Sequence, residues 1–349
     1  MDEIDAPATA KNIPVRRLRP GEEAGAHPLL AVWEITLHCD QPCAHCGSRA
    51  GSPRKDELSL DEALGVADAL CDMGVREVAF IGGEAYLFKG IERVIEHLAK
   101  RGIWVIMQTG GRAFGPERAR RYADAGLKSL GISIDGDQET HDMIRNNRGS
   151  YAAAIGALEA GRSAKLLMTV NTTVSRPSSR HLTALCEDLV ARDVRGWNVA
   201  LLVPMGRTVE RPEWLLEPWR VVDVIDELAG LQYRYADLTD DGRPRLDISA
   251  SNNLGYYGPH ESVLRSRPHG YENIWGGCAA GVLTVAIEAD GTVKGCPSLP
   301  TKPYAGGNVR DTALRDIWGK TAPMRFARDR DLDELWGRCK SCDYAEHCK

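Results

Sequence analysis

The chain has 349 residues, of which 43% are hydrophobic and 27% are charged, a composition typical of an ordinary globular protein. Lys and Arg number 44 against 49 Asp and Glu, and the resulting net charge of −5 argues against broad electrostatic binding of nucleic acid. No apolar run approaches the roughly 20 residues of a membrane span, and the N-terminus lacks the apolar segment of a signal peptide. We therefore expect a cytoplasmic protein with neither a nucleic-acid nor a membrane partner.

Ten cysteines are distributed unevenly along the chain. Three stand close together at Cys39, Cys43 and Cys46, and five more follow residue 277. Clustered cysteines in a large chain without a secretory signal favour metal or iron–sulfur ligation over disulfides. Cys71 and Cys186 stand alone on the apolar faces of predicted helices, where we expect buried and unreactive thiols.

Residues 29–205 alternate between strand-like and helix-like stretches. Apolar runs predict strands over 30–36, 77–81, 103–107, 129–134, 166–171 and 198–203. Helical spacing follows over 59–71, 91–98, 116–125, 151–162 and 179–192, and Ser59 with Glu62 forms a capping-box pair at the first of these. This alternation predicts an α/β fold with a parallel sheet. Six units fit a partial (β/α)6 barrel of the TIM type, with a doubly wound open sheet as the alternative.

The remaining segments differ in composition from this core. Residues 1–28 predict an irregular N-terminal arm. Residues 206–275 predict one helix, over 219–228, and a connecting segment rich in Gly, Pro, Asn and Ser. Residues 276–349 carry five cysteines and an Asp290-Gly291 hairpin signal, which predicts a small cysteine-rich domain held by metal.

The first cysteine group follows the first predicted strand directly, at the expected mouth of the barrel. Three thiolates on so short a loop can hold three irons of a cubane cluster, Cys39, Cys43 and Cys46 each binding one. The fourth iron then keeps an open position for a substrate or cosubstrate, as in catalytic metal sites. Zinc bound by the three cysteines with His38 or His45 is the alternative.

Several motifs now combine into a specific resemblance. The C-x3-C-x2-C spacing after a first strand resembles the signature of radical S-adenosylmethionine (SAM) enzymes. Gly82-Gly83-Glu84-Ala85 resembles the GGEP motif of that family, with Ala85 in place of proline, and Thr109-Gly110-Gly111 stands where the family often has Thr-Asn-Gly. The stretch from Ser133 to Arg145 (SIDGDQETHDMIR) resembles the SxDG…HDxxR pattern of peptide-modifying members.

The resemblance implies roles for particular residues. Cys39, Cys43 and Cys46 would bind the 4Fe-4S cluster that holds SAM, and Asp135 is a candidate catalytic residue. The residues expected to contact SAM are His45, Gly82, Gly83, Glu84, Thr109, Ser133 and Arg145.

The C-terminal cysteines resemble the opening of the SPASM extension, which holds auxiliary 4Fe-4S clusters in many radical SAM maturases. The resemblance implies at least one auxiliary cluster, bound by Cys278, Cys296, Cys339 and Cys342, with Cys348 as a further candidate ligand. The pattern breaks off at Lys349, so we expect either a shortened extension or a truncated chain. A zinc ribbon is the alternative.

By this resemblance the chain is an enzyme that generates a 5′-deoxyadenosyl radical and abstracts hydrogen from a substrate C–H bond. The implied reaction is post-translational modification of a ribosomally made peptide by crosslinking, thioether formation or epimerisation, with flavodoxin or ferredoxin as electron donor. Oxidative modification or decarboxylation of a haem-like tetrapyrrole is the second enzyme hypothesis. A non-enzymatic iron–sulfur scaffold or redox sensor would need neither the GGEA nor the SIDG motif.

Overall fold

The computed structural model describes residues 26–237, 239, 244–251, 254–255, 258–265 and 277–348. Most of the predicted N-terminal arm, together with residues 266–276 of the predicted connecting segment, lies outside the described residues.

Ten strands form one sheet in the order β10-β9-β8-β1-β2-β3-β4-β5-β6-β7. All pairs from β8 through β1 to β7 are parallel, whereas β9 and β10 run antiparallel to their neighbours. The bounds are β1 Leu30–Thr36, β2 Glu77–Gly82, β3 Trp104–Thr109, β4 Leu127–Ser133, β5 Leu167–Val174, β6 Gly196–Leu201, β7 Asp247–Ala250, β8 Thr284–Ile287, β9 Thr292–Lys294 and β10 Gly307–Asn308.

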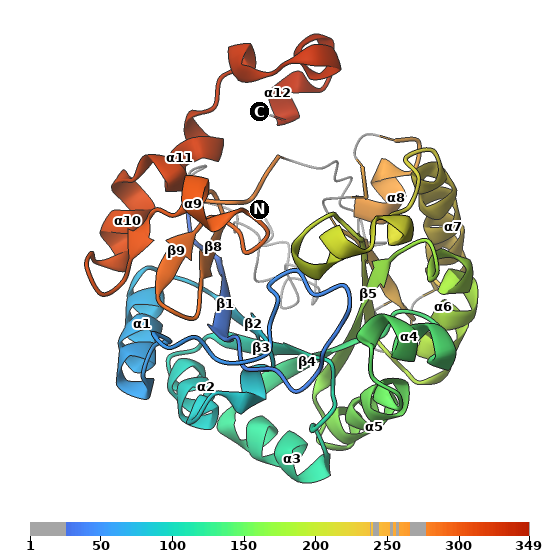
Figure 1. The fold of residues 1–349 in the computed structure, drawn as a ribbon, viewed down its shortest axis with the longest axis horizontal. Helices are drawn as coiled ribbons and strands as arrows, with labels where there is room; N and C mark the ends of the chain where they lie inside the picture. The colour runs from blue at the N-terminus through green and yellow to red at the C-terminus, as the bar shows by residue number, and fades with distance from the viewer. Residues whose placement is uncertain are drawn as a thin grey trace, which may run out of the picture.

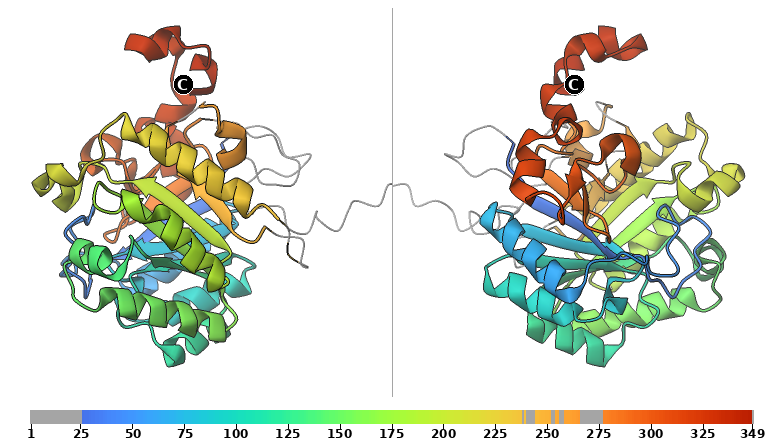
Figure 2. Two further views of the ribbon diagram at one scale, coloured as in Figure 1. Left: turned by 90° about the vertical axis from the view of Figure 1, so that its right-hand side faces the viewer. Right: turned by 60° about the vertical axis from the view of Figure 1, so that its left-hand side comes forward.

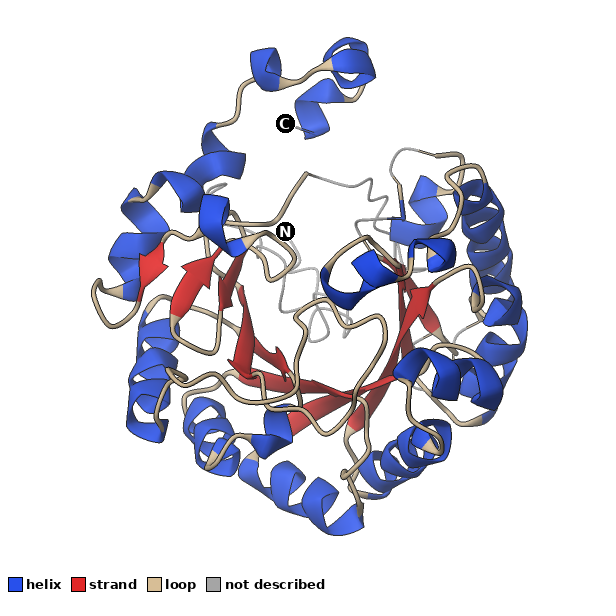
Figure 3. Ribbon diagram, viewed as in Figure 1, coloured by secondary structure: helices blue, strands red, loops and turns tan. Residues whose placement is uncertain are grey.

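Helices cover the outer face of this sheet. Figure 3 shows the strands as an arc inside a ring of helices, which is the predicted open barrel of the TIM type and not a doubly wound sheet with helices on both faces. The helices are α1 Leu60–Asp72, α2 Ile91–Lys100, α3 Pro116–Ala125, α4 Gln138–Arg145, α5 Ser150–Ser163, α6 Leu182–Ala191, α7 Arg220–Arg234, α8 Glu261–Arg265, α9 Thr301–Tyr304, α10 Leu314–Lys320, α11 Ala322–Asp329 and α12 Ala345–Cys348.

The hydrophobic core lies between the strands and the helices. Because side chains alternate across a strand, one face of each strand is apolar and faces the helix layer, as Trp33 on β1, Phe80 on β2 and Trp197 on β6 do. The opposite face lines the inside of the barrel and carries polar residues. Asn171 of β5, for example, donates a hydrogen bond there to the side chain of Gln108 on β3.

Two strands depart from the sequence-based expectation. The predicted connecting segment contains β7, which extends the sheet beside β6, and the helix α8. A four-residue strand is too short to show a recognisable alternation, so the sequence does not reveal it. Similarly, β8 belongs to the predicted C-terminal domain but pairs in parallel with β1. The C-terminal segment therefore begins as part of the barrel sheet. Its hairpin turns at Asp290-Gly291, as predicted, with Gly291 at φ +86°.

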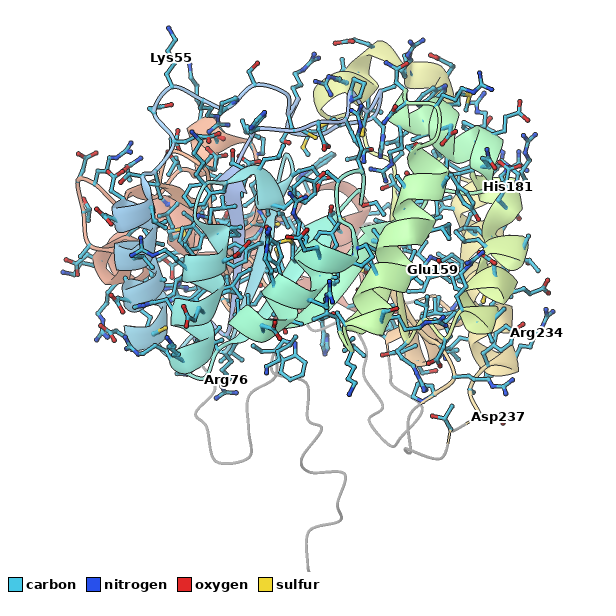
Figure 4. All side chains as sticks on the ribbon, turned by 90° about the horizontal axis from the view of Figure 1, so that it is seen from below. Lys55, Arg76, Glu159, His181, Arg234 and Asp237 are labelled. Carbon is cyan, nitrogen blue, oxygen red and sulfur yellow. The ribbon has the colours of Figure 1, made fainter. Side chains whose placement is uncertain are left out.

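The loop after the cysteine group and the start of β2 lie at opposite ends of the barrel. Figure 4 places Lys55, in the loop that follows the cysteine group, at one end of the strands, and Arg76, just before β2, at the other.

Residues 330–348 extend away from the ring of helices (Figure 1, Figure 2). In the described part of the chain, no helix has the length and apolar character needed to cross a membrane.

Candidate active site

A cavity of about 380 Å³ opens at the carboxyl ends of the strands, within the size range of ligand-binding clefts. All three cysteines of the first group line it, and so does every residue expected to contact SAM. The predicted residues brought together here are Cys39, Cys43, Cys46, His45, Gly82, Gly83, Glu84, Thr109, Ser133 and Arg145. They meet because parallel strands all deliver their following loops to one edge of the sheet.

Each thiol of the group has an N–H donor directed at its sulfur. The distances to Sγ are 3.4 Å from the Gln41 amide to Cys39, 3.3 Å from the Ala50 amide to Cys46, and 3.9 Å from Arg145 Nη1 to Cys43. Burial raises the pKa of Cys39 to about 12 and that of Cys43 in the same direction. The buried thiols therefore ionise only when a positively charged group compensates for the lost hydration.

This donor set fits an iron–sulfur cluster better than a zinc ion. A single zinc ion needs its ligands to converge on one point at about 2.0–2.3 Å. Among the described residues, no three His, Cys, Asp or Glu side chains converge in this way, and His45 instead faces Asp135 at 3.9 Å. Three thiols spread around a cavity, each with an N–H donor, suit the larger cubane, whose cysteines bind separate irons.

Glu84 places a carboxylate inside the same cavity. The hydroxyl of Thr109 donates to its Oε2 at 2.5 Å, and the amide of Gly110 donates to its Oε1 at 2.8 Å. Burial raises the pKa of Glu84 to about 7, although both hydrogen bonds favour the carboxylate. Within the described residues no Lys, Arg or His forms an ion pair with Glu84. Its geometry thus suits a ligand that brings its own amino group.

The two glycines before Glu84 are required by packing against β1. Gly82 has φ +138°, and a Cβ there would lie 2.2 Å from the Thr36 carbonyl oxygen. A Cβ on Gly83 would lie 2.2 Å from the carbonyl oxygen of His38. The amides of Gly83 and Glu84 donate to these same two oxygens at 2.8 and 2.7 Å. This turn therefore fixes Glu84 relative to the strand that leads into the cysteines.

Asp135 lies behind the cavity wall and not on it. It is fully buried, with Oδ2 2.6 Å from Nη2 of Arg145. Burial alone would raise the pKa of Asp135, but the guanidinium of Arg145 holds it below its usual range. Arg145 also contacts the sulfur of Cys43, so the charged pair links the SIDG stretch to the cysteine loop. The position of Asp135 suits the orientation of Arg145 more than direct contact with a substrate.

His45 presents an uncharged ring to the cavity. Burial, together with the positive charge of the neighbouring Arg145, lowers the pKa of His45 to about 4, so the imidazole is neutral near pH 7. A neutral aromatic ring at this position can pack against a flat ligand without an added charge.

Part of the cavity wall comes from a segment that no sequence motif predicts. Residues 203–208, after β6, lie against the cysteine loop, where Arg207 donates to the carbonyl of Cys43 at 3.0 Å. Gly206 has φ +59°, and a Cβ there would lie 2.2 Å from the carbonyl oxygen of Cys46. These contacts join segments about 160 residues apart, so only the folded chain reveals them.

Further lining residues belong to no motif, among them the polar Gln41, Gln108 and Ser298. Gln41, between the first two cysteines, has a buried Nε2 without a hydrogen-bond partner among the described residues. An amide group aimed into the cavity is available to a ligand.

The auxiliary cysteines are only partly assembled. Cys278 and Cys296 are neighbours: burial raises the pKa of Cys278, and Cys296 raises it further. Cys339 and Cys342 are exposed in the tail, and the described residues contain no group of cysteines converging on one metal ion there. The structure therefore brings together one pair of the predicted set.

The end of the tail lies beside the residue that precedes Cys278. A Cβ on Gly277 would lie 3.0 Å from the carbonyl oxygen of His347, so the last helix reaches the residue next to Cys278. The side chain of Cys348 lies outside the described residues.

The two solitary cysteines are placed as expected for unreactive thiols. Cys186 is fully buried, and burial raises its pKa to about 12. Cys71 is half-buried on α1, and burial raises its pKa too. Neither lines the cavity.

The sequence is similar to two known protein families and to several known proteins. The radical SAM superfamily matches residues 33–181, and SPASM, an iron-sulfur cluster-binding domain, matches residues 278–343. An AdoMet-dependent heme synthase of Methanosarcina barkeri is 28% identical over 328 residues, covering 92% of this chain and 90% of its own. The mycofactocin maturase MftC of Mycobacterium ulcerans is also 28% identical, over 327 residues, covering 92% and 82%.

A solved structure shows the same fold. SuiB of Streptococcus suis, bound to S-adenosylmethionine, superposes with a TM-score of 0.72 at 16% identity, covering 93% of this chain and 72% of SuiB. SuiB has also been solved bound to its precursor peptide SuiA.

Proposed function

Because this chain belongs to the radical SAM superfamily and carries a C-terminal SPASM domain, we propose that it modifies a ribosomally made peptide. The reaction would begin with hydrogen abstraction from a C–H bond and end in a crosslink, a thioether or an inverted stereocentre. The two domains imply a SAM-binding 4Fe-4S cluster, auxiliary iron–sulfur ligation and SAM itself. A non-enzymatic scaffold role does not fit this family.

Different cavity residues would bind the cluster and SAM. Cys39, Cys43 and Cys46 would bind the cluster, and Glu84 would accept a hydrogen bond from the amino group of SAM. His45 would offer its neutral ring as a packing surface. When bound, the cluster and SAM supply a 5′-deoxyadenosyl radical, which removes a hydrogen atom from the substrate.

The protein itself supplies charge and orientation. Arg145, held by Asp135, keeps a positive charge beside Cys43, where it favours the thiolate. Residues 203–208, fastened to the cysteine loop through Arg207, form one side of the cavity. A wall of fixed shape restricts which C–H bond the radical meets.

One observation favours a peptide as substrate. Arg145 is the single Lys or Arg among the described residues that line the cavity, and Asp135 already pairs with it. A haem precursor carries several carboxylates, which need cationic partners when they are buried. A peptide segment brings neutral backbone and side-chain groups to the same surface. The similarity to mycofactocin maturases supports this substrate class.

A haem-like tetrapyrrole is the second candidate, because relatives named AdoMet-dependent heme synthase match nearly the whole chain. On this alternative the chain would oxidise or decarboxylate a side chain of the macrocycle. The carboxylates of the macrocycle would then bind cations outside the described cavity lining.

A direct comparison of substrates decides between the two candidates. Anaerobically reconstituted protein would be given SAM, a reductant and either Fe-coproporphyrin III or synthetic peptides encoded by short reading frames beside the gene. We expect a peptide to lose hydrogen mass, or to gain deuterium from heavy water at a stereocentre, while the porphyrin stays unchanged. Carbon dioxide released from the porphyrin, with every peptide unaltered, would instead establish the second candidate.

The position of Glu84 makes SAM binding dependent on pH. Below about pH 7 its carboxyl is neutral in the free protein, so binding that requires the carboxylate must release a proton. The affinity for SAM should be constant above neutrality and fall by up to about tenfold for each pH unit below it. Equilibrium dialysis of radiolabelled SAM against reconstituted protein measures this dependence.

Glu84→Gln should remove the pH dependence and weaken binding about 10- to 100-fold, the effect of one charge-assisted hydrogen bond. Glu62→Gln, on the outer helix α1, is the matched control and should keep the wild-type profile. A Glu84→Gln protein with the wild-type pH profile would place the amino group of SAM elsewhere.

Iron content tests the auxiliary ligands. We expect about eight irons in protein purified without oxygen, four at the first cysteine group and four in one auxiliary cluster. Replacing Cys342 by alanine should remove about four irons, whereas Cys348→Ala and the control Cys186→Ala should retain about eight. Elemental analysis with Mössbauer spectroscopy gives both counts.

Other totals would contradict this assignment. Near twelve irons would require a second auxiliary cluster, and zinc in place of half the iron would revive the zinc ribbon. If replacing Cys348 alone removed about four irons, Cys348 would be assigned as the fourth ligand of the auxiliary cluster.

A further inference from the structure

Gln41 is a buried polar residue to which none of the assigned roles gives a function. It lies between Cys39 and Cys43, lines the cavity and is only 3% exposed. The Nε2 atom of its side chain is buried and has no hydrogen-bond partner among the described residues. Leaving such a donor unpaired costs free energy, so this amide in the cavity wall indicates contact with a bound group.

The main chain of Gln41 is held in place on both sides. Its amide donates to Sγ of Cys39 at 3.4 Å, and the thiol of Cys39 donates to its carbonyl oxygen at 3.5 Å. The preceding residue, Asp40, accepts a hydrogen bond from the hydroxyl of Tyr86 at 2.8 Å, and Arg112 donates to the Asp40 carbonyl. The freedom that remains to Gln41 therefore lies in its side-chain torsions.

The two ends of the Gln41 side-chain amide face different groups. As a thiol, Cys43 donates to Oε1 of Gln41, with sulfur and oxygen 3.8 Å apart. On the other side, a Cβ on Gly110 would lie 2.5 Å from Nε2 of Gln41 and 3.0 Å from Oε1 of Glu84. Nε2 of Gln41 and Oε1 of Glu84 therefore border the same small space beside Gly110.

Binding of iron at Cys43 would reverse what the sulfur requires of this amide. A cysteine bound to iron is a thiolate, which accepts hydrogen bonds and has no S–H to donate. Oε1 of Gln41 would then face a negatively charged sulfur. A half-turn about the last side-chain torsion exchanges the oxygen and the nitrogen and keeps the shape of the amide. That turn would present an N–H to Cys43 and place Oε1 beside Glu84.

We propose that Gln41 adopts this turned orientation in the loaded protein, donating from Nε2 to Sγ of Cys43 and accepting, beside Glu84, from the amino group of SAM. An amino group has more than one N–H bond, so a second acceptor next to the carboxylate leaves fewer donors unpaired in a buried site. Gln41 would thus link assembly of the cluster to recognition of the amine. This inference rests on the proposed contact between Glu84 and SAM but on neither choice of substrate.

Comparison of SAM with its deaminated analogue tests the ligand contact. Gln41→Met keeps the length of the side chain but has no amide. It should weaken the binding of SAM about 3- to 10-fold, the effect of one hydrogen bond, and leave the binding of the analogue unchanged. Gln41→Glu keeps an acceptor at the same place and should bind SAM at least as tightly as the wild type. Equilibrium dialysis against reconstituted protein measures both ligands.

The reduction potential of the first cluster tests the sulfur contact. An N–H donor on a ligating sulfur stabilises the more negative, reduced cluster, so its removal lowers the potential. Gln41→Met and Gln41→Glu should both lower the potential, since neither side chain has an N–H to donate. Gln138→Met, at the exposed start of α4, is the matched control and should change neither potential nor affinity.

Redox titration followed by electron paramagnetic resonance measures the potential, and the signal that changes on addition of SAM identifies the first cluster. The two Gln41 variants should therefore agree in potential and differ in affinity for SAM. A merely structural effect of the substitution would not produce this split. The two ligand affinities of Gln41→Met decide the amine contact even if Gln41→Glu loses iron.

Three results would overturn the proposal. Unchanged SAM affinity in Gln41→Met would remove Gln41 from the ligand contact, and equal weakening of SAM and the analogue would assign it a structural role. A wild-type potential in Gln41→Met would exclude the N–H contact to Cys43.

Glu84→Gln separates this inference from the contact on which it rests. If Glu84→Gln keeps the wild-type preference for SAM over the deaminated analogue, the amine lies elsewhere and both assignments fail. If the preference falls in Glu84→Gln but not in Gln41→Met, only the role of Gln41 is contradicted. Neither measurement contains a peptide or a porphyrin, so failure of the substrate assignment leaves both results interpretable.

Discussion

The whole site depends on one pair of backbone hydrogen bonds, from the amides of Gly83 and Glu84 to the carbonyls of Thr36 and His38. These bonds fasten the turn after β2 to the end of β1, and they form only because no Cβ occupies either glycine position. As a consequence, the buried carboxylate of Glu84 is held at a fixed place beside the buried thiol of Cys43 and the half-buried thiols of Cys39 and Cys46. The Ala85 that replaces the proline of the family motif is also buried and leaves this arrangement intact.

A second constraint joins the C-terminal segment to the strand that carries the cysteine loop. β8 pairs directly with β1, so the strand that leads into the cysteine loop also borders the segment that carries the auxiliary cysteines. The charged groups between them, Glu34, Glu288 and Lys294, lie inside the barrel where hydration is limited. The C-terminal segment is therefore joined to the strand that leads into the cysteine loop by a parallel strand pair.

Local sequence patterns predicted much of this architecture. The features that they did not predict have a common cause. The strand at 30–36 and the capped helix after Ser59 follow from short-range periodicity, and convergence of the motif loops follows from parallel strands. The four-residue β7 carries too little pattern to recognise. The fastening of Arg207 to the cysteine loop and the position of Glu34 among distant charges depend on contacts between remote segments, which no local spacing encodes.

The central claim is that Cys39, Cys43 and Cys46 hold a cluster that activates SAM, and the formation of 5′-deoxyadenosine by reduced, reconstituted protein tests it most directly. The wild type should produce 5′-deoxyadenosine, and Cys43→Ala should produce none, because two thiolates do not retain an open-site cubane. Cys186→Ala, which changes a buried thiol outside the cavity, should remain active. Wild-type levels of 5′-deoxyadenosine from the Cys43 variant would contradict the account.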